Sequence, residues 1–298
     1  MNEKVLTVLE YVKISEMLRS KCATPLGTKE AEELRPMSDR EDIEKAQTET
    51  EDALNRIYRF GPVSMSGARD IRDSLLRLKV QANLSMPELL SIGVLLKTAY
   101  RVKSYGTRRE AESLEDSLTE SFQFLEPLSD FQKEIDRCIL SEEEMADDAS
   151  PQLFSIRRKI KTTAEKVRQE LNSFIVSGTS ALRENVITMR NGRFCLPVKS
   201  EARALVPGMI HDESGSGSTV FIEPMSVVKL NNEIRELEIA EKKEIEAVLA
   251  KLSDEAASHE DVLRADLRIL SHLDFVFAKA ALAKEMNAVR PAFSGDRS

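Results

Sequence analysis

Apolar residues recur every three or four positions through most of this 298-residue chain, the spacing that gives a helix one buried face. In residues 1–150 short turns interrupt the pattern. We predict a series of helices there, one capped at Ser38 or Asp39 and another opened by Pro87. The charged stretch 108–116 is predicted to be exposed. Residues 141–150 are acidic and poor in apolar residues, so we place a domain boundary at residue 150.

After this boundary the apolar positions form the seam of a coiled coil. Steps of three or four residues separate Leu153, Ile156, Ile160, Ala164, Val167, Leu171 and Phe174. The same period resumes at Val227, Leu230, Ile234 and Leu237. We predict an outgoing helix in 151–182 and a returning helix in 226–257, paired antiparallel over about 25 residues, or roughly 40 Å. Residues 258–298 are expected to return to the helical core (its first part being 1–150), and the chain is expected to be cut from something larger.

Between these two helices, residues 183–225 are rich in strand-forming residues. Asn191-Gly192 separates two apolar runs, and this pair is a strong hairpin signal because both central residues of a type I′ turn need positive φ. A second turn, Gly215-Ser216-Gly217-Ser218, predicts a second hairpin. The predicted fold is therefore mainly α, with a small antiparallel β element at the tip of a long helix pair.

Composition limits the class of protein. Charged residues make up 32% of the chain and aromatic residues 5%, a balance that favours long helices over a thick β core. The net charge of −8 means that any nucleic-acid surface must be a local basic patch. No run of about 18 apolar residues and no signal-peptide core is present. We therefore predict a soluble cytoplasmic protein with no membrane partner.

Candidate catalytic chemistry is sparse. Cys22, Cys138 and Cys195 are too few and too scattered for a disulfide framework or a zinc cluster. His211 and Asp212 could support hydrolysis, but no second histidine is near in sequence, so we predict neither a catalytic residue nor a metal site. The stretch 61–67 lacks the GxxxxGK[ST] pattern of a phosphate loop. We expect this chain to bind no cofactor and to be no enzyme by itself.

Charge is unevenly distributed along the predicted helix pair. Six bases oppose two acids in 155–171, a local charge of +4, whereas ten acids oppose four bases in 233–261, a local charge of −6. One interpretation is a solvated face with pairing between the helices. The other is that Arg157, Arg158 and Lys161 are unpaired and also contact phosphates.

The β-rich segment offers a second basic region, since five bases oppose two acids in 183–203, a local charge of +3. Phosphate contact through such side chains and turn amides would be independent of nucleotide sequence. The alternative is a small sheet whose charges only keep it soluble. The predicted nucleic-acid-binding residues are Arg183, Arg190, Arg193, Lys199, Arg203, His211, Ser214, Ser216 and Ser218.

Several motifs of the chain resemble the second type of the bacterial MutS family. They include ITMRNGRFCLPVK (187–199), GMIHDESGSGSTVFIEP (208–224) and VVKLNNEIRELE (227–238), with LEYVKISEML, ATPLGTKEAEEL and QTETEDAL nearer the N-terminus. The resemblance implies a helical core, two lever helices and a small β clamp at their tip. It also implies that full-length members add an ATPase domain, which uses ATP and magnesium and forms a homodimer, and an Smr endonuclease domain. Neither domain is expected here.

The resemblance implies two roles. One is the splitting of stalled or collided ribosomes for quality control, with the clamp on ribosomal RNA. The other is the binding of branched DNA, which suppresses recombination. We favour the ribosome, because this type lacks the mismatch-reading domain that inspects duplex DNA. Two further alternatives remain: a dimerisation or structural coiled-coil module, and a hydrolase that uses His211 and Asp212.

Overall fold

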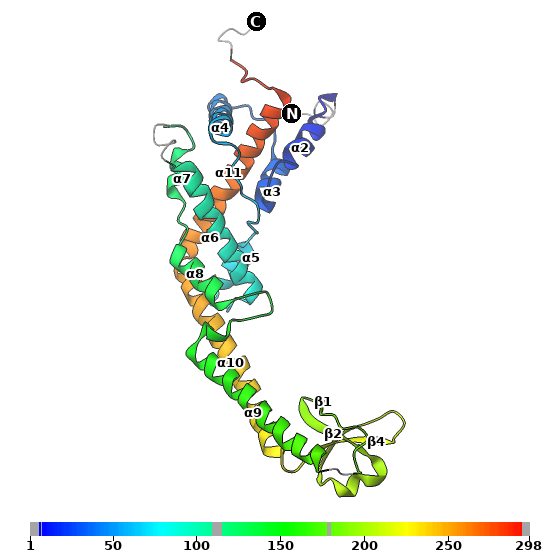
Figure 1. Ribbon diagram of the computed structural model, residues 1–298. Helices are drawn as coiled ribbons and strands as arrows, with labels where there is room; N and C mark the ends of the chain where they lie inside the picture. The colour runs from blue at the N-terminus through cyan, green and yellow to red at the C-terminus, as the bar shows by residue number, and fades with distance from the viewer. Residues whose placement is uncertain (1–5, 7, 109–114, 178–179, 294–298) are drawn as a thin grey trace. The chain divides into compact units, whose positions relative to one another are not determined.

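A computed structural model describes residues 6, 8–108, 115–177 and 180–293 (Figure 1). The chain divides into two compact units, unit 1 with residues 1–144 and 249–298 and unit 2 with residues 145–248. The predicted fold class is confirmed, because helices dominate and the strands form one small antiparallel sheet. No helix of the described part of the chain is long and apolar enough to cross a membrane.

Unit 1 is built around the helix α11, Glu260–Met286, which packs against α3, α4 and α6. Phe275, Val276 and Phe277 of α11 are buried, as are Leu95 of α6 and Phe122 of α7. The other helices of the unit are α2 (Tyr11–Arg19), α3 (Pro25–Glu33), α4 (Arg40–Phe60), α5 (Arg72–Lys79), α6 (Met86–Gly106), α7 (Thr119–Phe124) and α8 (Ser129–Cys138).

Side-chain caps fix where several of these helices begin. Asp39 accepts hydrogen bonds from the backbone N–H groups of Glu41 and Asp42, so the predicted cap of α4 is confirmed and is Asp39 rather than Ser38. Ser85 and Glu88 form a capping box that starts α6 one residue before Pro87. These short-range rules explain why the helix starts could be predicted from sequence.

The prediction that residues 108–116 are exposed is wrong for Asp116; residues 109–114 lie outside the described part of the chain. Arg56, whose side chain is 1% exposed, donates from Nε and Nη2 to the Asp116 carboxylate at 2.6 and 2.9 Å. Burial raises the pKa of Asp116. The hydrogen bonds and the charge of Arg56 together outweigh this effect, so the pKa of Asp116 lies below its usual value. The ion pair joins Asp116 to α4.

Unit 2 contains the 3₁₀ helix η2 (Asp147–Ala149), the helix α9 (Pro151–Val176) and the part of α10 (Val228–Ser258) that ends at Val248. Ser150 donates to Glu244 and Arg157 donates to Glu241, each at 2.7 Å. Farther along α9, Val167 and Leu171 share a buried cluster with Ile234. Later positions of α9 therefore meet earlier positions of α10, and the two helices are antiparallel in this unit, as predicted.

The sheet of unit 2 has the strand order β1-β2-β4-β3, with every neighbouring pair antiparallel. Asn191 and Gly192 join the first two strands with φ of 51° and 73°, so the predicted hairpin is confirmed. The Gly/Ser loop joins the last two strands and confirms the second hairpin. The elements are β1 (Thr188–Arg190), β2 (Arg193–Lys199), η3 (Ser200–Leu205), β3 (Gly208–Glu213) and β4 (Thr219–Pro224).

The stability of unit 1 should depend on pH through His272 of α11. Hydrogen bonds to Glu30 and Glu49 raise the pKa of His272 to about 9. Because this value exceeds the unfolded pKa of about 6.5, the stabilisation is complete below about pH 6.5 and is lost as the pH rises through about 9. The side chain is 42% exposed, so solvent screening limits the effect to about 1 kcal/mol.

Urea unfolding of the wild type and of His272→Gln at several pH values checks this prediction. We expect the variant to be less stable than the wild type by about 1 kcal/mol near pH 6, where Glu30 and Glu49 are ionised, and nearly equal to it above about pH 9.5. A difference between the two proteins that does not change with pH would contradict the assignment.

Candidate nucleic-acid interface

A buried glutamate organises the sheet of unit 2. Glu223 of β4 is 0% exposed, and its carboxylate accepts hydrogen bonds from Arg193 Nη1 of β2 at 2.9 Å and from Asn231 Nδ2 of α10 at 2.8 Å. His211 Nε2 of β3 lies 2.5 Å from the other carboxylate oxygen. A buried carboxylate is stable only with such partners. Glu223 therefore ties three strands and one helix together at a single point.

Asn231 also continues the hydrogen-bond ladder of the sheet. Its side-chain amide donates to Phe194 O at 3.2 Å, and its carbonyl oxygen accepts from Phe194 N at 3.3 Å. Strand β4 ends at Pro224, which has no N–H group to donate. The Asn231 carboxamide thus satisfies the backbone of β2 where β4 stops, and it fixes the end of the sheet against α10.

Arg190 closes the other side of the sheet. Its guanidinium lies 4.0 Å from the centre of the Phe221 ring, and its Nε lies 3.2 Å from the Asp212 carboxylate. The neighbouring Asn191 donates to His211 O at 2.9 Å. The two outer strands, β1 and β3, are therefore linked by side chains across the curled sheet.

These contacts change the expected charge of the β-rich segment. The +3 of residues 183–203 omits Asp212, Glu213 and Glu223, and residues 183–225 contain five bases and five acids. Three predicted contact residues, Arg190, Arg193 and His211, are partly buried and bonded within the sheet. The structure gives them a role in holding the sheet; binding of nucleic acid by them stays a prediction.

The other predicted residues lie at one end of the sheet, which we call the loop-end surface: Arg183, Lys199, Arg203, Ser214, Ser216 and Ser218. Arg183 N donates to Pro197 O, and Lys199 Nζ donates to Ser180 O. Ser200, which begins η3, bonds to Gly217 O at 2.6 Å and to Ser218 O at 3.2 Å. Among the described residues, none of the three bases has a carboxylate partner.

Hydroxyl groups order the Gly/Ser loop of this surface. Ser214 Oγ accepts from Thr219 N at 3.1 Å, and the hydroxyls of Ser216 and Ser218 lie 2.8 Å apart. Gly217 has a φ of 69°, a conformation that other residues rarely adopt. The loop therefore presents hydroxyls beside Lys199 and η3 in a defined arrangement.

On α9, the expectation that Arg157 is unpaired is wrong. Its guanidinium binds Asp147 at 2.5 Å and Glu241 at 2.7 Å, and it also donates to Met145 O. These hydrogen bonds raise the pKa of Arg157 although burial lowers it. Arg158 and Lys161, in contrast, are exposed and have no ion pair within the described segments.

The two residues considered for hydrolysis, His211 and Asp212, do not face a common partner. His211 directs Nε2 at Glu223, whereas Asp212 binds Arg190, so the two side chains have different partners. Burial raises the pKa of Cys22 to about 12 and those of Cys138 and Cys195 to about 11, which leaves all three thiols protonated at neutral pH. In the described part of the chain, no group of three His, Cys, Asp or Glu residues is placed to hold a metal ion.

The glycine stretch 61–67 does not have the structure of a phosphate loop for the ATP and magnesium that are expected for longer family members. This stretch connects the helices α4 and α5 rather than following a strand. Its carbonyl oxygens at Gly61 and Ser64 accept hydrogen bonds from Tyr105 and Arg101 of α6, at 2.9 and 2.8 Å. The loop is a connector between two helices.

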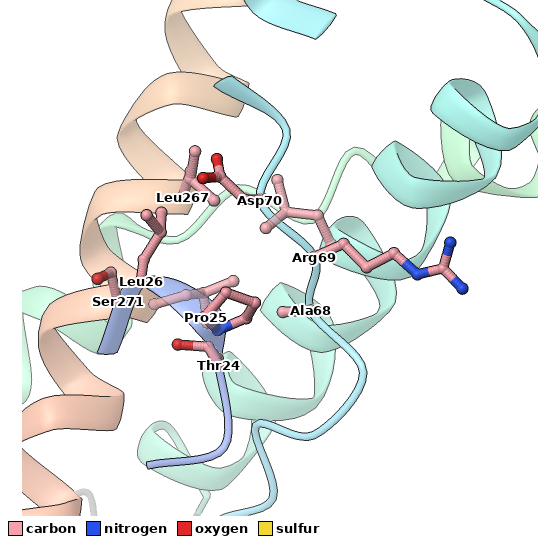
Figure 2. A pocket seen from close by; sticks show the side chains of 10 residues that line it. Thr24, Pro25, Leu26, Ala68, Arg69, Asp70, Leu267 and Ser271 are labelled. Carbon is pink, nitrogen blue, oxygen red and sulfur yellow. The ribbon is translucent and has the colours of Figure 1, made fainter. Parts of the chain in front are cut away.

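The hollows in the described part of unit 1 differ widely in size. A groove of about 820 Å³ lies between α2, α4 and the end of α11, with a mainly apolar lining that includes Leu54 and Ala283. The pocket in Figure 2 has about 10 Å³ of free space, room for about one water molecule, and Arg69 points away from it. Thr24 and Ser271 line this pocket with hydroxyls, but so small a space does not indicate a substrate site.

Sequence reasoning missed Glu223 and Asn231. Two signals were present: Glu223 interrupts the apolar run of β4, and Asn231-Asn232 lies inside a helical pattern, where asparagine is unfavourable. Asn232 also accepts from Arg193 Nη2 at 2.7 Å. The partners of these residues lie far away in sequence and could not be derived from a local pattern.

The fold and this site define a class of protein with two compact units, one of them helical and the other made of two antiparallel helices that carry a small β sheet. Over 99% of its length the chain is 48% identical to Endonuclease MutS2 of Lachnoclostridium phytofermentans. It is also 48% identical to Endonuclease MutS2 of Agathobacter rectalis and 45% identical to that of Lachnospira eligens, each over 99% of the chain. No family model matches.

The chain belongs to the MutS2 family and corresponds to an N-terminal region of MutS2 proteins. It spans about 38% of the length of these relatives.

Glu223→Ala should destabilise unit 2 by about 3 kcal/mol, because it removes the buried acceptor shared by Arg193, His211 and Asn231. Glu213→Ala is the matched control: Glu213 is exposed on β3, and its loss should change the free energy of unfolding by less than about 0.5 kcal/mol. Urea unfolding followed by circular dichroism measures both. Equal stability of the two variants would contradict the central role of Glu223.

Proposed function

We propose that this chain is the part of a MutS2 protein that grips nucleic acid, and that unit 2 holds the phosphate backbone without reading the nucleotide sequence. The loop-end surface carries this proposal. It combines Arg183, Lys199 and Arg203, without carboxylate partners in the described residues, with a loop of serine hydroxyls and backbone amides. Cations and backbone N–H groups are the usual ligands of phosphate oxygens.

The sheet would serve as a rigid support for this surface. Glu223, Arg193 and Asn231 fix the strands to α10, and Arg190 fixes β1 to β3. A support of this kind keeps the three bases in place without loss of further conformational freedom on binding. Because few phosphates are contacted and the net charge is −8, we expect weak, salt-sensitive binding.

We further propose that the nucleic acid is ribosomal RNA on stalled or collided ribosomes, which the intact protein would split for quality control. The hydroxyl-rich loop supports RNA, since serine side chains and backbone groups can hydrogen-bond to the ribose 2′-hydroxyl. In this proposal α9 and α10 act as lever helices and the sheet acts as a clamp. An ATPase domain outside this chain would drive the motion of a homodimer.

Branched DNA is the second candidate, with suppression of recombination as its role. The relatives are named endonucleases, which fits a protein that acts on nucleic acid. Phosphate contact would be the same for both polymers. A comparison of binding to a ribosomal RNA hairpin and to a four-way DNA junction distinguishes the two candidates.

Neutralising Arg183, Lys199 and Arg203 to Gln should weaken binding to both probes and lower the salt slope of log K by about 2 units. Neutralising Arg235, Lys242 and Lys243 on α10 is the matched control, because it removes the same charge from exposed positions elsewhere in unit 2. Fluorescence anisotropy at several salt concentrations gives affinity and slope. Equal losses in both variants would show a mere effect of net charge and would contradict the proposed site.

A further inference from the structure

Most bases of α9 form no ion pair with α10 among the described residues. Helix α9 carries six bases and two acids, whereas residues 228–248 of α10 carry four bases and six acids. Such complementary charges predict several inter-helix ion pairs. Among the described residues only Arg157–Glu241 joins the two helices in this way. Arg168 lies over the Phe194 ring at 5.6 Å.

The remaining four bases of α9 surround one exposed residue, Thr162. Arg158 and Lys166 are four positions from Thr162 and Lys159 is three positions away, so helical geometry places these three beside Thr162 on one face; Lys161 precedes Thr162 and lies about a quarter-turn round the helix, on the solvent side. All four are exposed, and no ion pair holds any of them in the described part of the chain. Two acids are helical neighbours of this set: Glu165 is three positions from Thr162, and Glu170 is four positions from Lys166. We call this set the Thr162 patch.

The seam of the helix pair faces away from this patch. Leu153, Val167 and Leu171 are fully buried on the opposite side of α9, so the patch points to solvent within unit 2. From Arg158 to Lys166 the helix rises about 12 Å, and a nucleic-acid duplex presents one phosphate per about 1.7 Å of its axis. Several phosphates therefore lie within reach of the four side chains at once.

We infer that the Thr162 patch, formed by Arg158, Lys159, Lys161 and Lys166, binds the phosphate backbone of the nucleic acid that unit 2 grips. The inference rests on the proposed function but uses different residues from the loop-end surface. The ligand chemistry is that of a phosphodiester backbone, common to RNA and DNA. The acidic α10 repels the same backbone, so that nucleic acid binds unit 2 from the α9 side.

The test compares two fourfold variants of the whole chain. The first changes Arg158, Lys159, Lys161 and Lys166 to Gln; the control changes Lys229, Arg235, Lys242 and Lys243, four exposed bases of α10, to Gln. Both lose four positive charges from helices of the same unit. The probes are a ribosomal RNA hairpin and a four-way DNA junction, measured by fluorescence anisotropy over a range of salt.

We expect the α9 variant to lose roughly 10- to 100-fold in affinity near 0.1 M salt, with a salt slope lower by about 3 units, and the control to change little. Equal losses in the two variants would overturn the inference, since net charge alone would explain them. An unchanged α9 variant beside a weakened loop-end variant would overturn the inference but leave the proposed function intact. Wild-type protein that binds neither probe at low salt would overturn both. Preference for one probe identifies the polymer.

Discussion

The carboxylate of Glu223, buried at the junction of β2, β3, β4 and α10, sets the geometry of unit 2. An ionised group without solvent needs hydrogen-bond donors around it, and Arg193, His211 and Asn231 supply them. Removal of the carboxylate would leave these donors without their acceptor, so the sheet and the helix depend on one another. Because Arg193 donates to Glu223, it does not belong to the bases that face solvent.

The sequence predicted those features of the fold that depend on near neighbours. The seam of α9, the Asn191-Gly192 turn and the cap at Asp39 follow from local spacing and turn chemistry. It did not predict which charges pair. Glu241 lies 84 residues after Arg157, and Asp116 lies 60 residues after Arg56. A charge count over a short window cannot include partners that lie far away in sequence. For this reason the +3 of residues 183–203 overestimates the positive charge of the whole β-rich segment, 183–225.

The corrected charges give a more specific account of how unit 2 would hold nucleic acid. Bases with carboxylate partners stabilise the sheet and the helix pair, whereas two groups of bases without such partners among the described residues form the loop-end surface and the Thr162 patch. Lys229, Lys242 and Lys243 also lack such partners but lie on the acidic helix α10. Both sets suit a grip on phosphates that is indifferent to nucleotide sequence. This proposal is compatible with the similarity of the chain to an N-terminal region of proteins named as endonucleases.

The proposed difference between the bases that bind nucleic acid and the exposed bases of α10 can be measured directly by covalent labelling of lysines, followed by mass spectrometry, with and without the ribosomal RNA hairpin. The account predicts that RNA protects Lys159, Lys161, Lys166 and Lys199 from the reagent, while Lys242 and Lys243 of α10 react equally in both states. Protection of the α10 lysines, or equal reactivity of the α9 lysines with and without RNA, would contradict it.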